Sequence, residues 1–360
     1  MIDISLCMIV KDEEDVIGRC LDSVKDIVDE IIIVDTGSTD KTKDIVGKYT
    51  DKVYDFKWIE DFAAARNFSF SKASKSYIMW LDADDVILQK DKVGLLNLKK
   101  SLSSTIDMVM MKYNVAFDAD GKPTHSYFRE RIFKRKNNYR WVGEIHEVIV
   151  PSGNIIHSEV AITHKKEGHK DPKRNIRIFE KMIKDGKKLG PREQFYYSRE
   201  LYYNYRYEEA IKGFEDFLDS GEGWIEDCIS ACKDMSTCYY LIKEDKKALY
   251  SLFRSFEFDE PRAEICCDVA KHLFDRAQYK QSIYWYKVAL NKDINDVKQG
   301  FKLNDCYDFI PSIQLSVCYD RLGDVEKAIF YHEKSKKLKP NNEAVLYNEN
   351  YYNSLKNKKK

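Results

Sequence analysis

Hydrophobic and polar residues alternate with two different rhythms along the chain. Over the first hundred residues or so, short apolar runs are separated by stretches whose apolar residues recur at helical spacing. Strands that return roughly every 20 to 25 residues, with helices between them, predict a parallel sheet covered on both faces, which is an α/β fold. The expected strands are 4–10, 30–35, 52–56 and 77–81, and the expected helices are 16–28, a segment capped by Ser38 or Thr39 and ending at Val46, 63–71, and one near Lys90.

The pattern becomes strand-rich between residues 107 and 165. Two alternating runs flank Asp120-Gly121, a dipeptide typical of tight turns, and predict a hairpin. Further short strands are expected at 139–143, 146–150 and 158–164. We therefore expect antiparallel additions to the α/β sheet from about residue 107.

Beyond about Pro172 the pattern is helical and amphipathic, and one phrase recurs four times. Its small central residues are Ala210, Ala248, Ser282 and Ala328, at spacings of 38, 34 and 46 residues. The last copy, LGDVEKAIFYHEKSKKLKPNN, resembles a tetratricopeptide repeat. We expect stacked helix pairs, hence two domains, 1–170 and 171–355. A generic helical domain is the alternative.

Composition excludes several classes of protein. Sixty basic and sixty acidic residues give no net charge, which offers no argument for binding nucleic acid or an anionic membrane surface. No window approaches the roughly 18 apolar residues of a membrane span, and the first residues do not resemble a signal peptide. Nine scattered cysteines without a CxxC pair indicate reduced thiols. The expected location is the cytoplasm.

The strand-like segment YIMWL runs directly into the acidic residues of LDADD. Ligands of open parallel sheets bind at the carboxyl ends of the strands. Asp82 and Asp84 would point to the same side of an extended chain, and Ala83 between them leaves room for a ligand. Clustered carboxylates of this kind suit Mg²⁺ or Mn²⁺ bound to a phosphate. The alternative is a turn whose aspartates cap the following helix.

Asp35 ends the second expected strand, in VDTGSTD. An acid at this position can accept a hydrogen bond from the base or sugar of a nucleotide. The first strand is not followed by GxGxxG, which argues against a nicotinamide enzyme and leaves a nucleotide possible. The alternative is a turn and helix cap.

Four segments in this order resemble the inverting family 2 glycosyltransferases, which have a GT-A fold: SLCMIVKDEEDVIGRCLDSV, EIIIVDTGSTDKT, FAAARNFSF and YIMWLDADD. RIFKRKNNYRWVGEIHE and ITHKKEG are similar to the bacterial, sublancin S-glycosyltransferase-like branch, in which tetratricopeptide-like helices also occur. The resemblance covers about residues 3 to 170 and implies a UDP-sugar donor with Mn²⁺ or Mg²⁺.

The resemblance also implies roles for residues around the donor. Asp84 would bind the metal, while Asp82 would contact the ribose or support the metal. His164 would complete the metal shell or contact the diphosphate. The nucleotide would be held by Asp35 at the uracil, by the backbone of Ile9 and Val10, and by Arg66 at the uridine or diphosphate. An ion pair of Arg66 with Glu60 or Asp61 on a helix surface is the alternative.

The catalytic base would come from GEIHE. Attack on the anomeric carbon needs a base for the acceptor's proton, and a carboxylate can serve. The resemblance favours Glu147, with Glu144 as the second candidate, and His146 could orient the base or touch phosphate. The alternating pattern of GEIHEVIV also fits a strand whose polar residues face solvent.

The leading hypothesis is a glycosyltransferase that modifies a peptide or protein, with the helical domain binding the acceptor or forming a homodimer. A transferase acting on a cell-surface glycan or lipid is a second possibility. A non-catalytic adaptor with a degenerate first domain is a third, and the intact Asp35, Asp82, Asp84 and Glu147 count against it. A nucleotidyltransferase is disfavoured because no Gly-rich loop follows the first strand.

Overall fold

The structure is a computed structural model that describes residues 1–165, 171–294 and 302–358. It contains two compact units. The sheet unit comprises Met1–Val115 and Tyr127–Lys187, and the helical unit comprises Ala116–Ser126 and Lys188–Lys360. The boundary at residues 170 and 171 stays a prediction.

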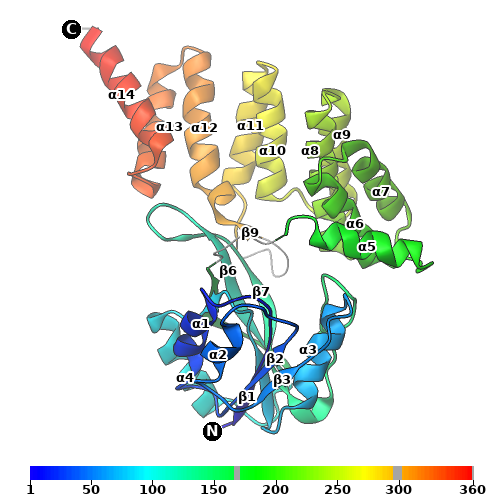
Figure 1. The fold of residues 1–360 in the computed structure, drawn as a ribbon. Helices are drawn as coiled ribbons and strands as arrows, with labels where there is room; N and C mark the ends of the chain where they lie inside the picture. The colour runs from blue at the N-terminus through cyan, green and yellow to red at the C-terminus, as the bar shows by residue number, and fades with distance from the viewer. Residues whose placement is uncertain (166–170, 295–301, 359–360) are drawn as a thin grey trace. The chain divides into compact units, whose positions relative to one another are not determined.

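The sheet unit is built on a mixed sheet with the strand order β3-β2-β1-β4-β7-β6-β8-β5 (Figure 1). Strands β3, β2, β1 and β4 are parallel, whereas β7 runs antiparallel to β4 and β5 antiparallel to β8. The strands are β1 Ile4–Val10, β2 Glu30–Asp35, β3 Val53–Asp55, β4 Tyr77–Trp80, β5 Asp85–Val86, β6 Met108–Phe117, β7 Pro123–Lys134 and β8 Ile155–His164. The expected α/β fold with antiparallel additions is confirmed.

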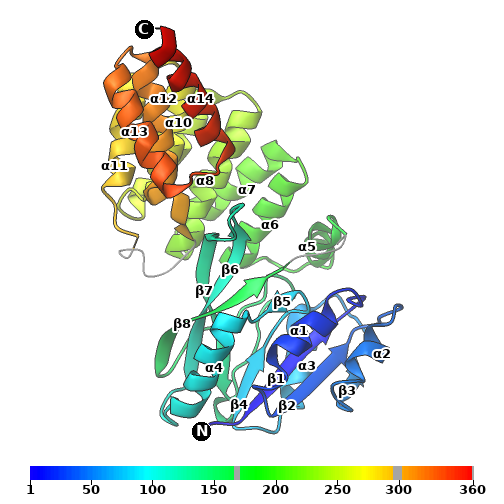
Figure 2. The same ribbon diagram turned by 90° about the vertical axis from the view of Figure 1, so that its left-hand side faces the viewer.

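Alternation along the central strands builds two hydrophobic layers. On one face, Leu6 and Met79 pack in a core with residues of the first, second and fourth helices. On the other face, Cys7 and Trp80 pack with residues of the third helix and with Trp141. Figure 2 shows the strands of this sheet from a second direction. The helices of this unit are α1 Ile17–Val24, α2 Thr42–Val46, α3 Phe62–Ser71, α4 Gln89–Ser101 and α5 Arg174–Lys184, with a 3₁₀ turn at Arg135–Asn137.

Three local expectations are wrong. Helix α1 ends at Val24, and α2 begins at Thr42 without a side-chain cap. The Ser38 hydroxyl instead accepts a hydrogen bond from the backbone N–H of Asp12. Segments 139–143 and 146–150 are not strands, since Val142 and Val148 form only an isolated bridge. Positive φ angles of 96° at Gly143 and 50° at His146 turn the chain back there.

The helical unit is a series of antiparallel helix pairs. Its helices are α6 Pro191–Tyr203, α7 Tyr207–Asp219, α8 Ile225–Leu241, α9 Asp245–Arg254, α10 Ala263–Asp275, α11 Tyr279–Leu290, α12 Phe309–Arg321, α13 Val325–Leu338 and α14 Glu343–Lys358. The four recurring phrases form α7, α9, α11 and α13, and their central residues Ala210, Ala248, Ser282 and Ala328 are all 0% exposed. Small side chains there allow the paired helices to approach closely.

Side chains 35 or 36 residues apart link successive first helices of the pairs. Arg199 of α6 lies 3.0 Å from Asp234 of α8, and Lys233 of α8 lies 3.5 Å from Asp268 of α10. The repeat period thus appears directly as an ion-pair ladder. The longer spacing of 46 residues arises from an insertion between α11 and α12, which includes strand β9 Lys302–Leu303 and the 3₁₀ turn Asn304–Tyr307.

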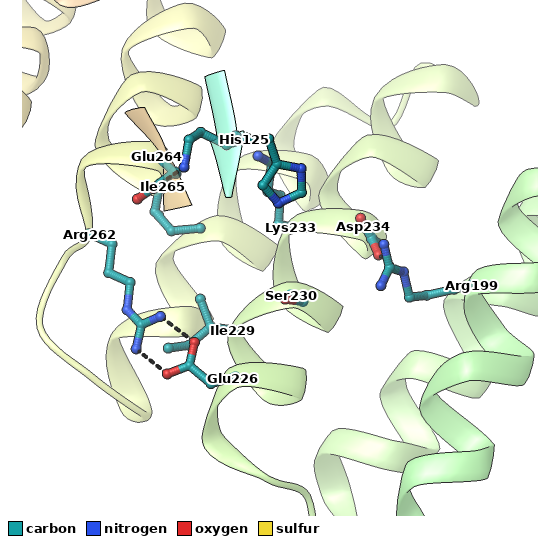
Figure 3. Close-up of a pocket in the computed structure, with 11 residues that line it drawn as sticks. His125, Arg199, Glu226, Ile229, Ser230, Lys233, Asp234, Arg262, Glu264 and Ile265 are labelled. Atoms are coloured by element: carbon teal, nitrogen blue, oxygen red, sulfur yellow. Dashed lines mark hydrogen bonds and ion pairs between the residues drawn. The ribbon is translucent and has the colours of Figure 1, made fainter. Parts of the chain in front are cut away.

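The tip of the β6–β7 hairpin belongs to the helical unit, where His125 and Ser126 pair with β9. There, His125 and Leu303 line a pocket of about 210 Å³ together with residues of α6, α8 and the start of α10 (Figure 3). Arg262 donates two hydrogen bonds of 2.5 and 2.9 Å to Glu226, and the lining holds three acidic residues beside Arg199, Lys233 and Arg262. The pocket therefore presents balanced charge.

Two further features of the described chain are the state of its cysteines and the hydrophobicity of its helices. All nine cysteines are free and buried. Across the part of the chain that the structure describes, none of the helices combines the length and the hydrophobicity needed to cross a bilayer.

Candidate active site

The acidic segment LDADD begins where β4 ends and leads into β5, which runs in the opposite direction. After Trp80 the chain leaves β4, and at Asp85 it pairs with the last residue of β8, His164. The backbone N–H of Lys165 also donates to the carbonyl of Asp84, at 2.9 Å. This pairing brings His164 to the acidic segment, although 79 residues of sequence separate His164 from Asp85.

Asp84, Asp85 and His164 form a cluster with the composition of a metal site. One potential ligand atom from each lies within 4.8 Å of the others. The His164 Nδ1 atom is 3.4 Å from an Asp84 oxygen and 3.6 Å from an Asp85 oxygen. Hydrogen bonds with Asp84 and Asp85 raise the pKa of His164 to about 9, against the opposing effect of its burial. Two carboxylates and an imidazole are donors that suit a divalent ion such as Mn²⁺.

Asp85 is the most restrained member of this cluster. It is fully buried, and its carboxylate accepts hydrogen bonds from Arg131 at 3.0 Å and from the Tyr113 hydroxyl at 2.9 Å. It also accepts one from the backbone N–H of Asp82 at 3.1 Å. Asp85 thereby fixes the backbone turn that presents Asp82 and Asp84.

Arg66 joins Asp82 to Glu147. Its Nη2 donates to Asp82 at 2.8 Å, and its Nε donates to Glu147 at 2.6 Å. The guanidinium lies 4.8 Å from the ring centroids of both Trp80 and Trp141, so its faces are in range for cation–π contact. Burial disfavours its charge, but the two carboxylates outweigh that effect and raise the pKa of Arg66.

The same arrangement acts on Asp82. Burial opposes its ionisation, yet Arg66 and Arg131 lower the pKa of Asp82 well below its usual range. Asp82 is thus bonded to Arg66, while Asp84 lies with His164. The alternative partners of Arg66 are engaged elsewhere: Asp61 caps α3 by accepting from Ala64, and Glu60 pairs with Lys181.

GEIHE forms a loop, and its two glutamates have different surroundings. Glu147 is bonded to Arg66, beside the acidic strand end. Glu144 pairs with Lys187 at 2.5 Å; burial opposes its charge, but this pair lowers the pKa of Glu144. The ring of His146 stacks on Phe179 of α5, with centroids 6.1 Å apart. The geometry thus associates Glu147, and not Glu144, with Asp82.

The residues expected to hold the nucleotide stand at the carboxyl ends of β1 and β2, where Val10 pairs with Asp35. The Asp35 carboxylate accepts hydrogen bonds from the backbone N–H groups of Gly37 and Ser38, at 3.0 Å each, so it also has the turn-forming role considered as the alternative. Ile9 is partly exposed, whereas Val10 is buried. Ala83 packs into the hydrophobic core.

Sequence reasoning missed several residues that shape this site. They are Trp80, Asp85, Tyr113, Arg131, Trp141 and Phe179. Asp85 belongs to LDADD and Trp141 to YRWVG, but the pattern of these segments assigns neither residue a role. Phe179 and Tyr113 carry no sequence signal, because their partners are His146 and Asp85, which are far away along the chain.

Comparison with known proteins relates residues 5–163 to a protein family. The model of glycosyl transferase family 2 matches residues 5–163. The glycosyltransferase SunS of Bacillus phage SPbeta is 29% identical over 218 residues, which are 57% of this chain and 50% of that protein. A TPR repeat-containing protein of Synechococcus elongatus is 35% identical over 151 residues, 41% of this chain and 36% of that protein.

A third relative is the lipopolysaccharide core biosynthesis glycosyltransferase LpsC of Rhizobium meliloti. It is 26% identical over 162 residues, 42% of this chain and 58% of that protein. The chain therefore spans between about a third and three fifths of the length of these relatives. Residues 5–163 form a family 2 glycosyltransferase domain, and tetratricopeptide-like helix pairs follow it.

Proposed function

We propose that the protein is an inverting glycosyltransferase that transfers a sugar from a UDP-sugar to a nucleophilic side chain of a polypeptide. The observation that carries the proposal is the fork of Arg66 between Asp82 and Glu147. It brings a candidate base to the acidic end of β4, where a donor's diphosphate would lie. Sugar transfer needs a bound donor and a base for the acceptor's proton. The Arg66 guanidinium holds one candidate residue for each of these roles.

The donor side of the site would contain a divalent cation. Asp84 and His164 would hold Mn²⁺ or Mg²⁺, with Asp85 kept in position by Arg131 and Tyr113. Bound there, the ion would supply charge neutralisation for the departing diphosphate.

The remaining donor contacts would come from the carboxyl ends of β1 and β2. Ile9 and Val10 would border the uracil through their backbone, with Asp35 beside them. Asp82 would face the ribose, and Arg66 would also contact the uridine or diphosphate. The planar guanidinium fork suits phosphate oxygens.

Glu147 would act on the acceptor. As the acceptor's O–H or S–H approaches, Glu147 takes its proton, and the oxygen or sulfur forms a bond to the anomeric carbon. The bond from that carbon to the diphosphate oxygen breaks on the opposite face, so the configuration inverts and UDP leaves with the electron pair. Arg66 would keep the Glu147 carboxylate aimed at the acceptor.

The helical unit supports the proposed polypeptide acceptor. Stacked helix pairs present extended surfaces that suit extended peptides. A homodimer through this unit stays a prediction. Incubating cell extract with labelled UDP-glucose or UDP-N-acetylglucosamine, followed by mass spectrometry, would identify the sugar and the modified group. Label in a glycan or lipid instead of a protein would overturn the proposed acceptor class.

Two glutamate variants test the base. Glu147→Gln should lower UDP-sugar turnover by about 10² to 10⁴-fold, because the amide cannot accept the proton. Glu144→Gln, the matched control, should keep turnover within about threefold, because Glu144 pairs with Lys187 away from Arg66. Turnover is measured as UDP release with and without Mn²⁺. Equal losses in the two variants would contradict the assignment.

A binding measurement tests the metal site separately. UDP with Mn²⁺ should raise the melting temperature of the wild type and of Glu147→Gln, but not of Asp84→Ala. A wild type that neither binds UDP with Mn²⁺ nor releases UDP from either donor would favour the non-catalytic adaptor.

A further inference from the structure

The loop that carries Glu147 is closed and conformationally demanding. Val142 and Val148 exchange backbone hydrogen bonds of 2.9 and 3.1 Å, so the residues between them form a short closed loop. Within it, His146 has a φ of 50°, a left-handed conformation that is uncommon outside glycine, although histidine adopts it more often than most residues do. Contacts with neighbouring side chains help to keep His146 in this conformation.

Most of the loop is fixed by the sheet unit's core. The backbone N–H of Phe62 donates to the Glu144 carbonyl at 2.8 Å. Asn67 brackets Trp141 at the loop's base, donating to its carbonyl and accepting from its N–H, both at 2.9 Å. Arg66 bonds the Glu147 side chain. These contacts lie on both sides of His146 along the chain.

Helix α5 contacts the ring of His146 directly. The rings of His146 and Phe179 are stacked at an interplanar angle of 20°. Phe179 is 0% exposed, and its neighbours Ile176, Ile178 and Met182 are also buried, so it cannot move without disturbing the packing of α5. Lys187, just beyond the helix, also meets the loop in a partly exposed ion pair with Glu144, which contributes little.

From this geometry we infer that Phe179 is a positioning residue for the proposed base. By stacking on His146 it holds the strained backbone and thereby aims the adjacent Glu147 at the acidic strand end. The inference rests on the proposed role of Glu147. It extends the working site beyond residues 5–163 to the first helix that follows the sheet.

Paired variants in the full chain test the inference. Phe179→Leu keeps apolar volume and removes the ring, whereas Ile178→Val trims a buried neighbour and leaves the ring in place. Phe179→Leu should lower kcat for UDP-sugar hydrolysis by about tenfold to a hundredfold, the scale of a misplaced catalytic group. The Kd for UDP with Mn²⁺ should change less than about threefold, and Ile178→Val should leave both values near those of the wild type.

Two further measurements keep the test decisive. His146→Asn removes the ring and retains a residue that tolerates positive φ, so it should reproduce the Phe179→Leu loss if the latter variant does not fold. Hydrogen exchange at 142–148 should accelerate in Phe179→Leu and stay unchanged in β1.

The possible failures are distinguishable. Wild-type kcat together with unchanged exchange in the loop would overturn the inference while leaving the proposed function intact. Weakened UDP binding in step with kcat would indicate general loosening and would also overturn it. A wild type that does not hydrolyse UDP-sugars would count against the proposed function. Hydrogen exchange at 142–148 in Phe179→Leu would then decide whether Phe179 restrains the loop.

Discussion

At the residue scale, Arg66 shows how one side chain can serve fold and site together. Its guanidinium satisfies two carboxylates and contacts two indole rings, and the residue is only 8% exposed. Such a position needs a planar cation with donors in a fixed fork. The sequence suggested Arg66 as a donor contact, but its bond to Glu147, 81 residues away, has no local signature.

Arg66→Lys should therefore be strongly destabilising although it conserves charge. A single ammonium cannot reach both carboxylates in the same geometry or lie flat between the two rings. We expect a loss of about 2 to 4 kcal/mol in the free energy of unfolding, measured by urea denaturation. Arg177→Lys is the control, since Arg177 pairs with Asp171 on the surface and should change stability by less than about 0.5 kcal/mol. Similar losses in both variants would refute this account of Arg66.

At the element scale, the ladder between first helices explains how degenerate repeats still stack. Arg192 of α6 faces Asp227 of α8 at 3.7 Å, and Arg199 and Asp234 pair seven residues further along the same two helices. The recurring phrase predicted the second helices correctly. It did not predict the ladder, because the charged residues of the first helices lie outside that phrase.

The pair of Arg192 and Asp227 should make the free energy of unfolding depend on pH. Burial raises the pKa of Asp227 to about 6, although Arg192 opposes the effect. An acid with a raised folded-state pKa binds its proton more tightly when folded, so its charged form destabilises the fold above pH 6 or so. This destabilisation shrinks as the pH falls through 6 and vanishes below 3.8, the ordinary pKa of an aspartate.

Asp227→Asn should remove the destabilisation that the ionised Asp227 carboxylate causes. Above pH 7 the variant should be more stable by up to about 3 kcal/mol, and the gain should disappear near pH 4. Melting temperatures from pH 4 to 8 would measure the trend. Asp216→Asn, at an exposed position of α7, should show no such dependence. A gain for Asp227→Asn that is the same at every pH would contradict the explanation.

At the scale of the whole molecule, the sequence predicted regular elements well and long-range partners poorly. The bounds of β1 and β2 were predicted from apolar runs alone, because buried parallel strands are continuous in sequence. The loop 142–148 was misjudged as strands, because alternation cannot reveal the positive φ of His146. The grouping of residues 116–126 with the helices was also missed, since it depends on contacts with residues near 303 and 339.

Lys339 is the clearest of those distant contacts. Its ammonium lies 3.0 Å from Asp118 at the hairpin tip and 2.8 Å from Asp305 in the insertion, and it is largely buried. Lys339→Ala would leave two carboxylates side by side without their cation, which should cost about 1 to 3 kcal/mol. Hydrogen exchange should become faster at 117–126 and in the 3₁₀ turn at Asn304–Tyr307. Lys337→Ala, at an exposed position of α13, should change neither. If both variants exchange like the wild type, apolar packing and β9 pairing hold the tip without help from this ion pair.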